Sequence, residues 1–115
     1  MLLLATEEQR NSLTDAERLF IWRRRAGMTK LGAAKRLRVS RRVYHGWETN
    51  REPRNRPTKK VPDLTLCEFC VLLRRRRGVR TTDLAEEIGV SRTWLAQLER
   101  GVADPSRLYS FWGVM

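Results

Sequence analysis

The chain has little of what a metal centre, a disulfide framework or a membrane span requires. Its only two cysteines, Cys67 and Cys70, lie in one apolar run, and its single histidine, His45, lies elsewhere. A structural zinc site usually needs four ligands, and the βαβ context of a redox CxxC motif is missing, so we expect core or partly buried thiols, no metal and no cofactor. No apolar run approaches membrane-spanning length, and residues 1–4 are too short for the apolar part of a signal peptide, so we expect a cytoplasmic protein with no membrane partner.

The sequence also lacks a recognisable catalytic arrangement. No carboxylate cluster, no nucleophile with an adjacent base and no phosphate-binding loop stands out, so we expect that the protein is not an enzyme. No stretch alternates apolar and polar residues, and we expect no substantial sheet. What remains is a globular composition, 41% hydrophobic, with a net charge of +11 that predicts attraction to polyanions.

The chain contains an internal repeat. Shifting the sequence by 51 positions aligns residues 13–48 with residues 64–99, with twelve identities and no gap. Such a repeat indicates that the same supersecondary unit is built twice. We therefore predict an N-terminal unit with a basic linker at residues 1–60 and a C-terminal unit with an apolar tail at residues 61–115.

Each unit is predicted to contain three helices. A capping box, Thr-x-x-Glu, begins at Thr14 and again at Thr65, and each opens a helix of about three turns that ends at a glycine. A short helix follows at residues 30–37 and at residues 81–88, and a serine then caps a third helix in each unit. Two short helices joined by three or four residues are typical of the helix-turn-helix arrangement.

The first copy reads GMTKLGAAKRLRVSRRVYHGWETNREP, and the second reads GVRTTDLAEEIGVSRTWLAQLERGVADPS. They share a glycine, an N-cap threonine, a Leu-Ala or Ala-Ala step, Val-Ser-Arg, an apolar pair, a terminal glutamate, and Gly or Asn before a proline. This pattern resembles Cro/repressor-type helix-turn-helix domains, the xenobiotic-response-element class. The first copy departs at Arg38 and Asn50, where glycine is usual. The resemblance covers residues 13–53 and 64–107 and implies an all-α fold of two tandem lambda-repressor-like units.

The resemblance also implies which residues meet DNA. In such domains the second helix crosses the phosphate backbone, and the third lies in the major groove with its N-terminal residues at base edges. The residues expected to contact bases are Arg41, Arg42, His45, Arg92, Thr93 and Gln97, with Gly46 allowing close backbone approach. The residues expected to contact phosphates are Thr29, Lys30, Lys35, Arg80 and Thr81, together with Arg54 and Arg56 of the basic linker.

Arginine residues elsewhere have a structural interpretation. The family often has an Arg–Glu pair that ties the first helix to the end of the third. The resemblance implies Arg23–Glu48 and Arg74–Glu99 as structural ion pairs rather than DNA contacts. The other arginines of the runs at residues 23–25 and 74–77 can be solvated helix ends, which the macrodipole favours, or phosphate contacts.

The two units differ in charge and in how their cores can close. Residues 1–60 have a net charge of +10 and residues 61–115 one of +1, so we expect the N-terminal unit to dominate DNA electrostatics. Related domains close their core with a fourth and a fifth helix. Only the proline-rich linker at 48–63 follows the first copy, so the helix at 64–77 could be shared between the units. The apolar tail, Leu108, Tyr109, Phe111 and Trp112, could pack on its own unit or on another subunit.

The sequence predicts a sequence-specific, double-stranded DNA-binding transcriptional regulator, a phage or bacterial repressor, with its N-terminal recognition helix in the major groove. A homodimer is expected through the C-terminal unit or the apolar ends. Two alternatives stay open: an antitoxin-type autorepressor, with a toxin as partner, and an inhibitor or adaptor that binds a phage or host protein. Trp94 is expected to face either a protein or DNA.

Overall fold

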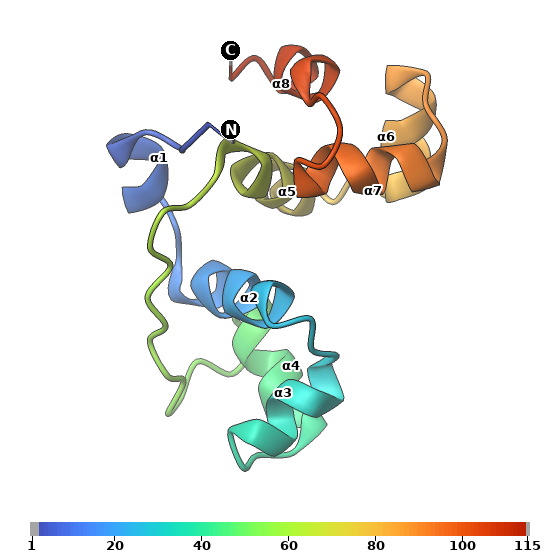
Figure 1. Ribbon diagram of the computed structural model, residues 1–115. Coiled ribbons are helices and arrows are strands. Elements are labelled where there is room, and N and C mark those ends of the chain that lie inside the picture. The colour runs from blue at the N-terminus through green and yellow to red at the C-terminus, as the bar shows by residue number, and fades with distance from the viewer. Residues whose placement is uncertain (1–2, 115) are drawn as a thin grey trace. The chain divides into compact units, whose positions relative to one another are not determined.

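The protein is described by a computed structural model that places residues 3–114. These residues form only helices, apart from a single antiparallel bridge between Leu4 and Thr65, so the all-α fold class is confirmed (Figure 1). In chain order the helices are α1 (Glu7–Asn11), α2 (Asp15–Arg25), α3 (Lys30–Arg36), α4 (Arg41–Thr49), α5 (Leu66–Arg77), α6 (Thr81–Ile88), α7 (Arg92–Arg100) and α8 (Ser106–Trp112).

The chain divides into two compact units, and the division differs from the expected one at its start. The N-terminal unit is Asn11–Pro62, and the C-terminal unit combines residues 63–114 with residues 3–10. The Ala5 N–H donates to the Leu64 carbonyl, and the Leu66 N–H donates to the Leu3 carbonyl, each at 2.8 Å. These non-local backbone bonds place the first residues with the C-terminal unit rather than within the expected 1–60 unit.

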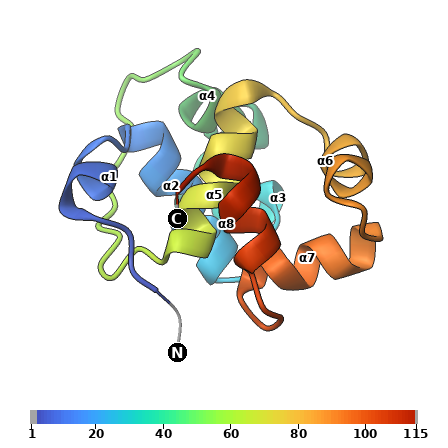
Figure 2. The ribbon, with the colours of Figure 1, turned by 90° about the horizontal axis from the view of Figure 1, so that it is seen from above.

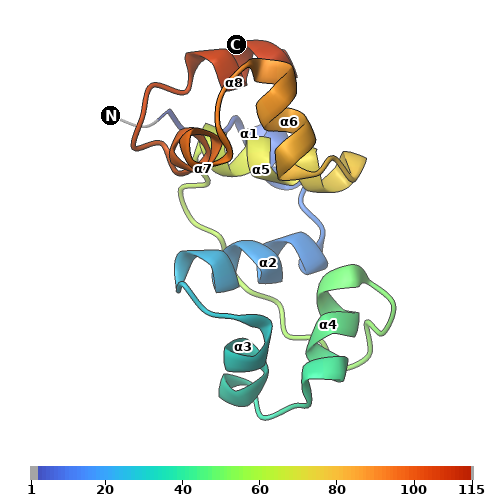
Figure 3. The ribbon, with the colours of Figure 1, turned by 90° about the vertical axis from the view of Figure 1, so that its right-hand side faces the viewer.

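The N-terminal unit has α3 and α4 on one side of α2 (Figure 3). Thr14 begins α2 with the expected capping box, in which its hydroxyl accepts from the Glu17 N–H at 3.1 Å. The buried core is formed by Leu19, Ala33, Ala34, Tyr44 and Trp47. In α4, Tyr44 is fully buried and Val43 is exposed, so Tyr44 and Trp47 supply the inward face of this helix.

The segment that follows α4 closes this core without a further helix. The Trp47 indole Nε1–H donates to the Arg54 carbonyl at 2.9 Å. In return, Arg56 Nη1 donates to the Trp47 carbonyl at 3.2 Å and to Asn50 Oδ1 at 2.8 Å. The linker expected after the first copy is therefore folded onto its own unit.

The turn between α3 and α4 holds a residue in a conformation that suits glycine. Arg38 has φ +60°, and the equivalent position in the C-terminal unit is Gly89, with φ +80°. A left-handed conformation costs a residue with a Cβ roughly 1–2 kcal/mol. Arg38 thus adopts the same left-handed geometry as the glycine at the equivalent position, at a cost in stability.

Replacing Arg38 by glycine is expected to stabilise the N-terminal unit by about 1 kcal/mol, because the left-handed backbone would no longer be strained. Urea unfolding followed by tryptophan fluorescence would measure this change. Lys35→Gly is the matched control, because Lys35 lies within α3, where glycine costs roughly 0.5–1 kcal/mol. A loss of stability in Arg38→Gly would contradict the prediction.

The C-terminal unit is organised around α5, whose residues 66–72 are all buried. This helix packs against α7 and α8, and Figure 2 shows α8 lying across it. The apolar tail thus forms a helix on its own unit, with Leu108, Tyr109 and Trp112 buried and Phe111 exposed. The sharing of α5 with the N-terminal unit stays a prediction.

Both thiols lie inside the C-terminal unit, as expected. Cys67 and Cys70 are buried, and the Cys67 sulfur lies 3.2 Å from the Tyr109 hydroxyl. Burial raises the pKa of the Cys70 thiol to about 12, with further contributions from Cys67 and Glu99. Within residues 3–114 there is no group of three or more His, Cys, Asp or Glu residues placed to hold a metal ion. None of the described helices is both long and apolar enough to span a membrane.

Candidate nucleic-acid interface

A buried ion pair sets the position of α4. Arg23 Nε lies 2.6 Å from Glu48 Oε2, and Arg23 Nη2 donates to Glu48 Oε1 at 3.1 Å. The Tyr44 hydroxyl also donates to Glu48 Oε2. Burial, followed by the Glu48 carboxylate, raises the pKa of the Tyr44 hydroxyl. Since Glu48 is only 1% exposed, this cluster fastens the end of α4 to α2 inside the N-terminal unit.

The C-terminal unit has the equivalent ion pair, Arg74–Glu99, with longer nitrogen–oxygen distances. Arg74 Nε lies 2.8 Å from Glu99 Oε2, and Arg74 Nη2 lies 3.5 Å from Glu99 Oε1. Leu95 stands where Tyr44 stands in the other unit, so this position supplies no hydroxyl to the pair. Within each unit, the ion pair therefore ties the third helix to the first, and in the N-terminal unit the Tyr44 hydroxyl also donates to the glutamate.

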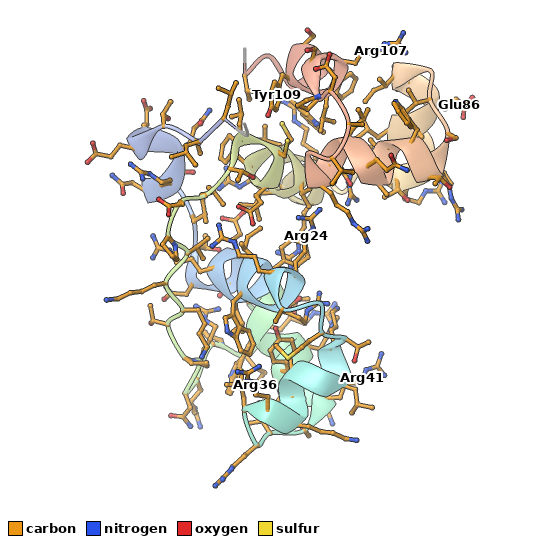
Figure 4. All side chains as sticks on the ribbon, in the orientation of Figure 1. Arg24, Arg36, Arg41, Glu86, Arg107 and Tyr109 are labelled. Carbon is orange, nitrogen blue, oxygen red and sulfur yellow. The ribbon has the colours of Figure 1, made fainter. Side chains whose placement is uncertain are left out.

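The N-terminus of α4 exposes a group of cationic and polar side chains. Ser40 caps the helix by accepting from the Val43 N–H at 3.1 Å. Directly after this cap, Arg41, Arg42 and His45 are exposed and line a recess of about 460 Å³, which we call the α4 recess (Figure 4 labels Arg41). Three of the residues expected to contact bases are thus brought together by the structure.

Lys30 of α3 contacts His45, one of the three residues that line the α4 recess. Its Nζ lies 2.9 Å from His45 Nδ1. A residue expected at the phosphates and one expected at base edges are therefore in direct contact. The sequence did not indicate this contact, because it depends on how α3 and α4 pack and on the rotamers of both side chains.

Gly46 has a different role from the expected one. It is buried, and its carbonyl accepts from the N–H groups of Arg51 and Glu52 at 3.0 and 3.2 Å. A Cβ at this position would lie 2.9 Å from the Glu52 Cβ. The interpretation that Gly46 allows close approach to DNA is therefore wrong: glycine is needed because the chain folds back here after α4.

The residues expected to contact phosphates in the N-terminal unit fall into two groups. Lys35 and Arg54 are exposed, whereas Thr29 caps α3 by accepting from the Gly32 N–H at 3.0 Å. Arg56 is half-buried in the hydrogen bonds that close the core. Among further linker cations, Lys59 Nζ lies 4.5 Å from the centroid of the Trp22 ring. Part of the linker charge therefore stabilises the unit itself.

The C-terminal unit presents a mixed surface. Arg92 and Thr93 of α7 are exposed and Gln97 is half-buried, while Thr81 of α6 is exposed. Arg80, rather than the expected threonine, occupies the N-cap position of α6, and it makes no side-chain cap because a guanidinium has no acceptor. Its Nε donates to Asp83 Oδ2 at 3.1 Å.

Acidic and aromatic side chains are also exposed on these two helices. Glu86 and Glu87 lie on the outer face of α6, and Figure 4 shows Glu86 directed away from the unit. Trp94, the residue before the buried Leu95 of α7, is 47% exposed. Phosphate groups would meet less positive charge here than at α3 and α4.

The structural division separates the charges more sharply than the sequence halves do. The N-terminal unit contains 15 Lys and Arg against 4 Asp and Glu, a net charge of +11. The C-terminal unit contains 9 of each kind and has no net charge. Long-range attraction to a polyanion thus resides in the N-terminal unit.

Comparison with known proteins identifies one part of the chain. Residues 72–108 match a family model described as a helix-turn-helix domain. The match runs from the second half of α5 through α6 and α7 into α8. No curated protein and no solved structure matches the chain. The matched part of the C-terminal unit is therefore similar to helix-turn-helix domains.

Proposed function

We propose that the protein is a sequence-specific DNA-binding transcriptional regulator made of two tandem helix-turn-helix units of the Cro/repressor class. The family match supports this for the C-terminal unit. For the N-terminal unit, the support is the twelve identities of the repeat, together with helices α2, α3 and α4, which correspond to α5, α6 and α7 of the C-terminal unit. A small repressor of phage or bacterial type, acting in the cytoplasm and without enzymatic activity, fits this architecture.

The observation that carries the proposal is the exposure of Arg41 and Arg42 in the first turn of α4. The helix macrodipole disfavours cations at this end, and no acidic residue lies in this turn. Two arginines there are best explained by an external anion. In a helix-turn-helix domain, these positions meet the major groove of DNA.

A homodimer would explain how a protein with one strongly basic unit per chain recognises both half-sites of an operator. In the C-terminal unit, Phe111 is 42% exposed, and the neighbouring Trp112 Nε1 is buried without a hydrogen-bond partner in the described structure. Leu3 and Leu4 of the same unit are 43% and 53% exposed. A second copy packed on this unit would cover these groups and supply a second α4 for the other half-site.

The proposal is tested by selecting bound duplexes from a random pool at two salt concentrations. We expect enrichment of a two-fold symmetric sequence with half-sites about one helical turn, or 10 base pairs, apart, and weaker binding at the higher salt. Sedimentation of the free protein at micromolar concentration tests the dimer separately. Enrichment of no duplex would contradict DNA recognition, and sedimentation as a monomer would contradict the dimer.

A second candidate function follows from the surface of the C-terminal unit. Its zero net charge and the exposed Trp94 suit a protein contact better than a phosphate backbone, because tryptophan is enriched at protein interfaces. An antitoxin or an adaptor would use this surface for its partner. A Trp94→Ala variant that keeps full DNA binding but loses repression in cells would favour this function.

A further inference from the structure

Two of the three side chains that line the α4 recess present only hydrogen-bond donors. The guanidinium groups of Arg41 and Arg42 each have five N–H donors and no acceptor. His45 is the third lining residue, and a neutral imidazole can present either a donor or an acceptor. The character of the recess therefore depends on which ring nitrogen of His45 bears the hydrogen.

Lys30 decides the tautomer of His45. A lysine ammonium can only donate, so the 2.9 Å contact requires His45 Nδ1 to be the acceptor. The single ring hydrogen of the neutral imidazole then lies on Nε2. With Lys30 in place, His45 has no acceptor nitrogen left, and it offers its Nε2–H to any ligand in the recess.

Two side chains near the α4 recess that could accept hydrogen bonds, Glu48 and Asn50, already bind other residues of the unit. The Glu48 carboxylate is buried with Arg23 and Tyr44. The Asn50 side-chain oxygen accepts from Arg56 at 2.8 Å. Glu52 is exposed, but it lies against Gly46 and is not among the residues that line the recess.

Base edges differ in the pattern of donors and acceptors that they present in the major groove. Guanine presents two acceptors, N7 and O6, whereas adenine combines an acceptor with a donor and cytosine presents a donor. Thymine offers one acceptor beside a methyl group. A surface that presents only donors therefore complements guanine and opposes cytosine and adenine.

We infer that the α4 recess recognises guanine edges in the half-site, with Lys30 as a positioning residue that acts through His45. This inference rests on the proposed function and specifies its ligand. Arg41 and Arg42 supply the forked donors for N7 and O6, and His45 supplies a single donor for an adjacent acceptor. Lys30 would raise affinity through its charge and raise selectivity through the tautomer that it enforces.

The inference is tested with the duplexes recovered from the selection, by replacing their guanines one at a time with 7-deazaguanine. This analogue lacks the N7 acceptor but pairs normally. We expect about tenfold weaker binding for each contacted guanine, and no such difference in the Arg41→Ala, Arg42→Ala double variant. Inosine is the matched control, because it removes only the minor-groove amino group and should leave binding unchanged.

The role of Lys30 is tested without DNA. His45 is the only histidine, so a nitrogen-resolved NMR spectrum of neutral imidazole reports on it alone. We expect the Nε2–H tautomer in the native protein and in Lys30→Arg, and a mixture of tautomers in Lys30→Met. An Nδ1–H tautomer in the native protein would overturn the positioning role.

The outcomes separate the inference from the function on which it rests. If the pool yields no enriched duplex, the proposed function fails. If it yields duplexes whose essential bases are adenine or cytosine, or if 7-deazaguanine has no effect, the guanine assignment alone is overturned and sequence-specific binding stands.

Discussion

Replacing Arg41 and Arg42 together by alanine is expected to abolish discrimination between an operator duplex and a scrambled duplex. Both side chains are exposed at the start of α4, so their removal should leave the fold intact. A good bidentate contact contributes about 1–3 kcal/mol of discrimination, which predicts a loss of about 2–6 kcal/mol for the pair. A mobility shift assay on both duplexes at fixed salt would measure it.

The repeat provides a matched control for this experiment. Arg92 lies at the position equivalent to Arg41, at the start of α7 in the unit with no net charge. Arg92→Ala is expected to change binding much less than Arg41→Ala. Equal losses would indicate that both units of one chain grip the same operator. An unchanged operator preference in the double variant would contradict the assignment of α4 as the recognition helix.

Replacing Glu48 by alanine is expected to destabilise the N-terminal unit strongly. Glu48 is 1% exposed and accepts hydrogen bonds from both Arg23 and Tyr44. Its removal would leave a largely buried guanidinium and a buried hydroxyl without their shared partner. Breaking a buried pair in this way costs about 3–5 kcal/mol, a large share of the stability of a unit of this size.

This loss of stability is measurable in urea by near-ultraviolet circular dichroism. Glu99→Ala is the matched control, and we expect it to cost less because its pair with Arg74 is longer and lacks the tyrosine. Joint replacement of Arg23 by methionine and Glu48 by leucine should recover part of the loss, because it leaves no unpaired charge. A Glu48→Ala variant as stable as the native protein would contradict this account.

The local features of the fold could be predicted from the sequence. The capping boxes at Thr14 and Thr65 and the serine caps at Ser40 and Ser91 begin helices because each side chain binds an N–H of the first turn of its helix. The sequence also contains a start signal for α1. Thr6 and Gln9 form a capping-type pair, with the Gln9 N–H donating to the Thr6 hydroxyl at 3.1 Å.

The non-local features could not be predicted in the same way. No periodicity indicates that Ala5 bonds to Leu64 or that Arg56 closes the core around Trp47, because these contacts depend on the path of an irregular chain. The position of Gly46 was misinterpreted for the same reason. Its importance becomes visible only with the backward turn at Arg51 and Glu52. The Lys30–His45 contact likewise requires the packing of two helices.

The backbone bonds from Leu3 and Ala5 to the start of α5 bear on synthesis by the ribosome. These bonds cannot form until Leu66 has left the exit tunnel, by which time all of residues 11–62 have emerged. The N-terminal unit can thus fold before residues 3–5 have formed their hydrogen bonds to Leu64 and Leu66. Trimming residues 3–5 would therefore damage the C-terminal unit, which is translated after the N-terminal unit.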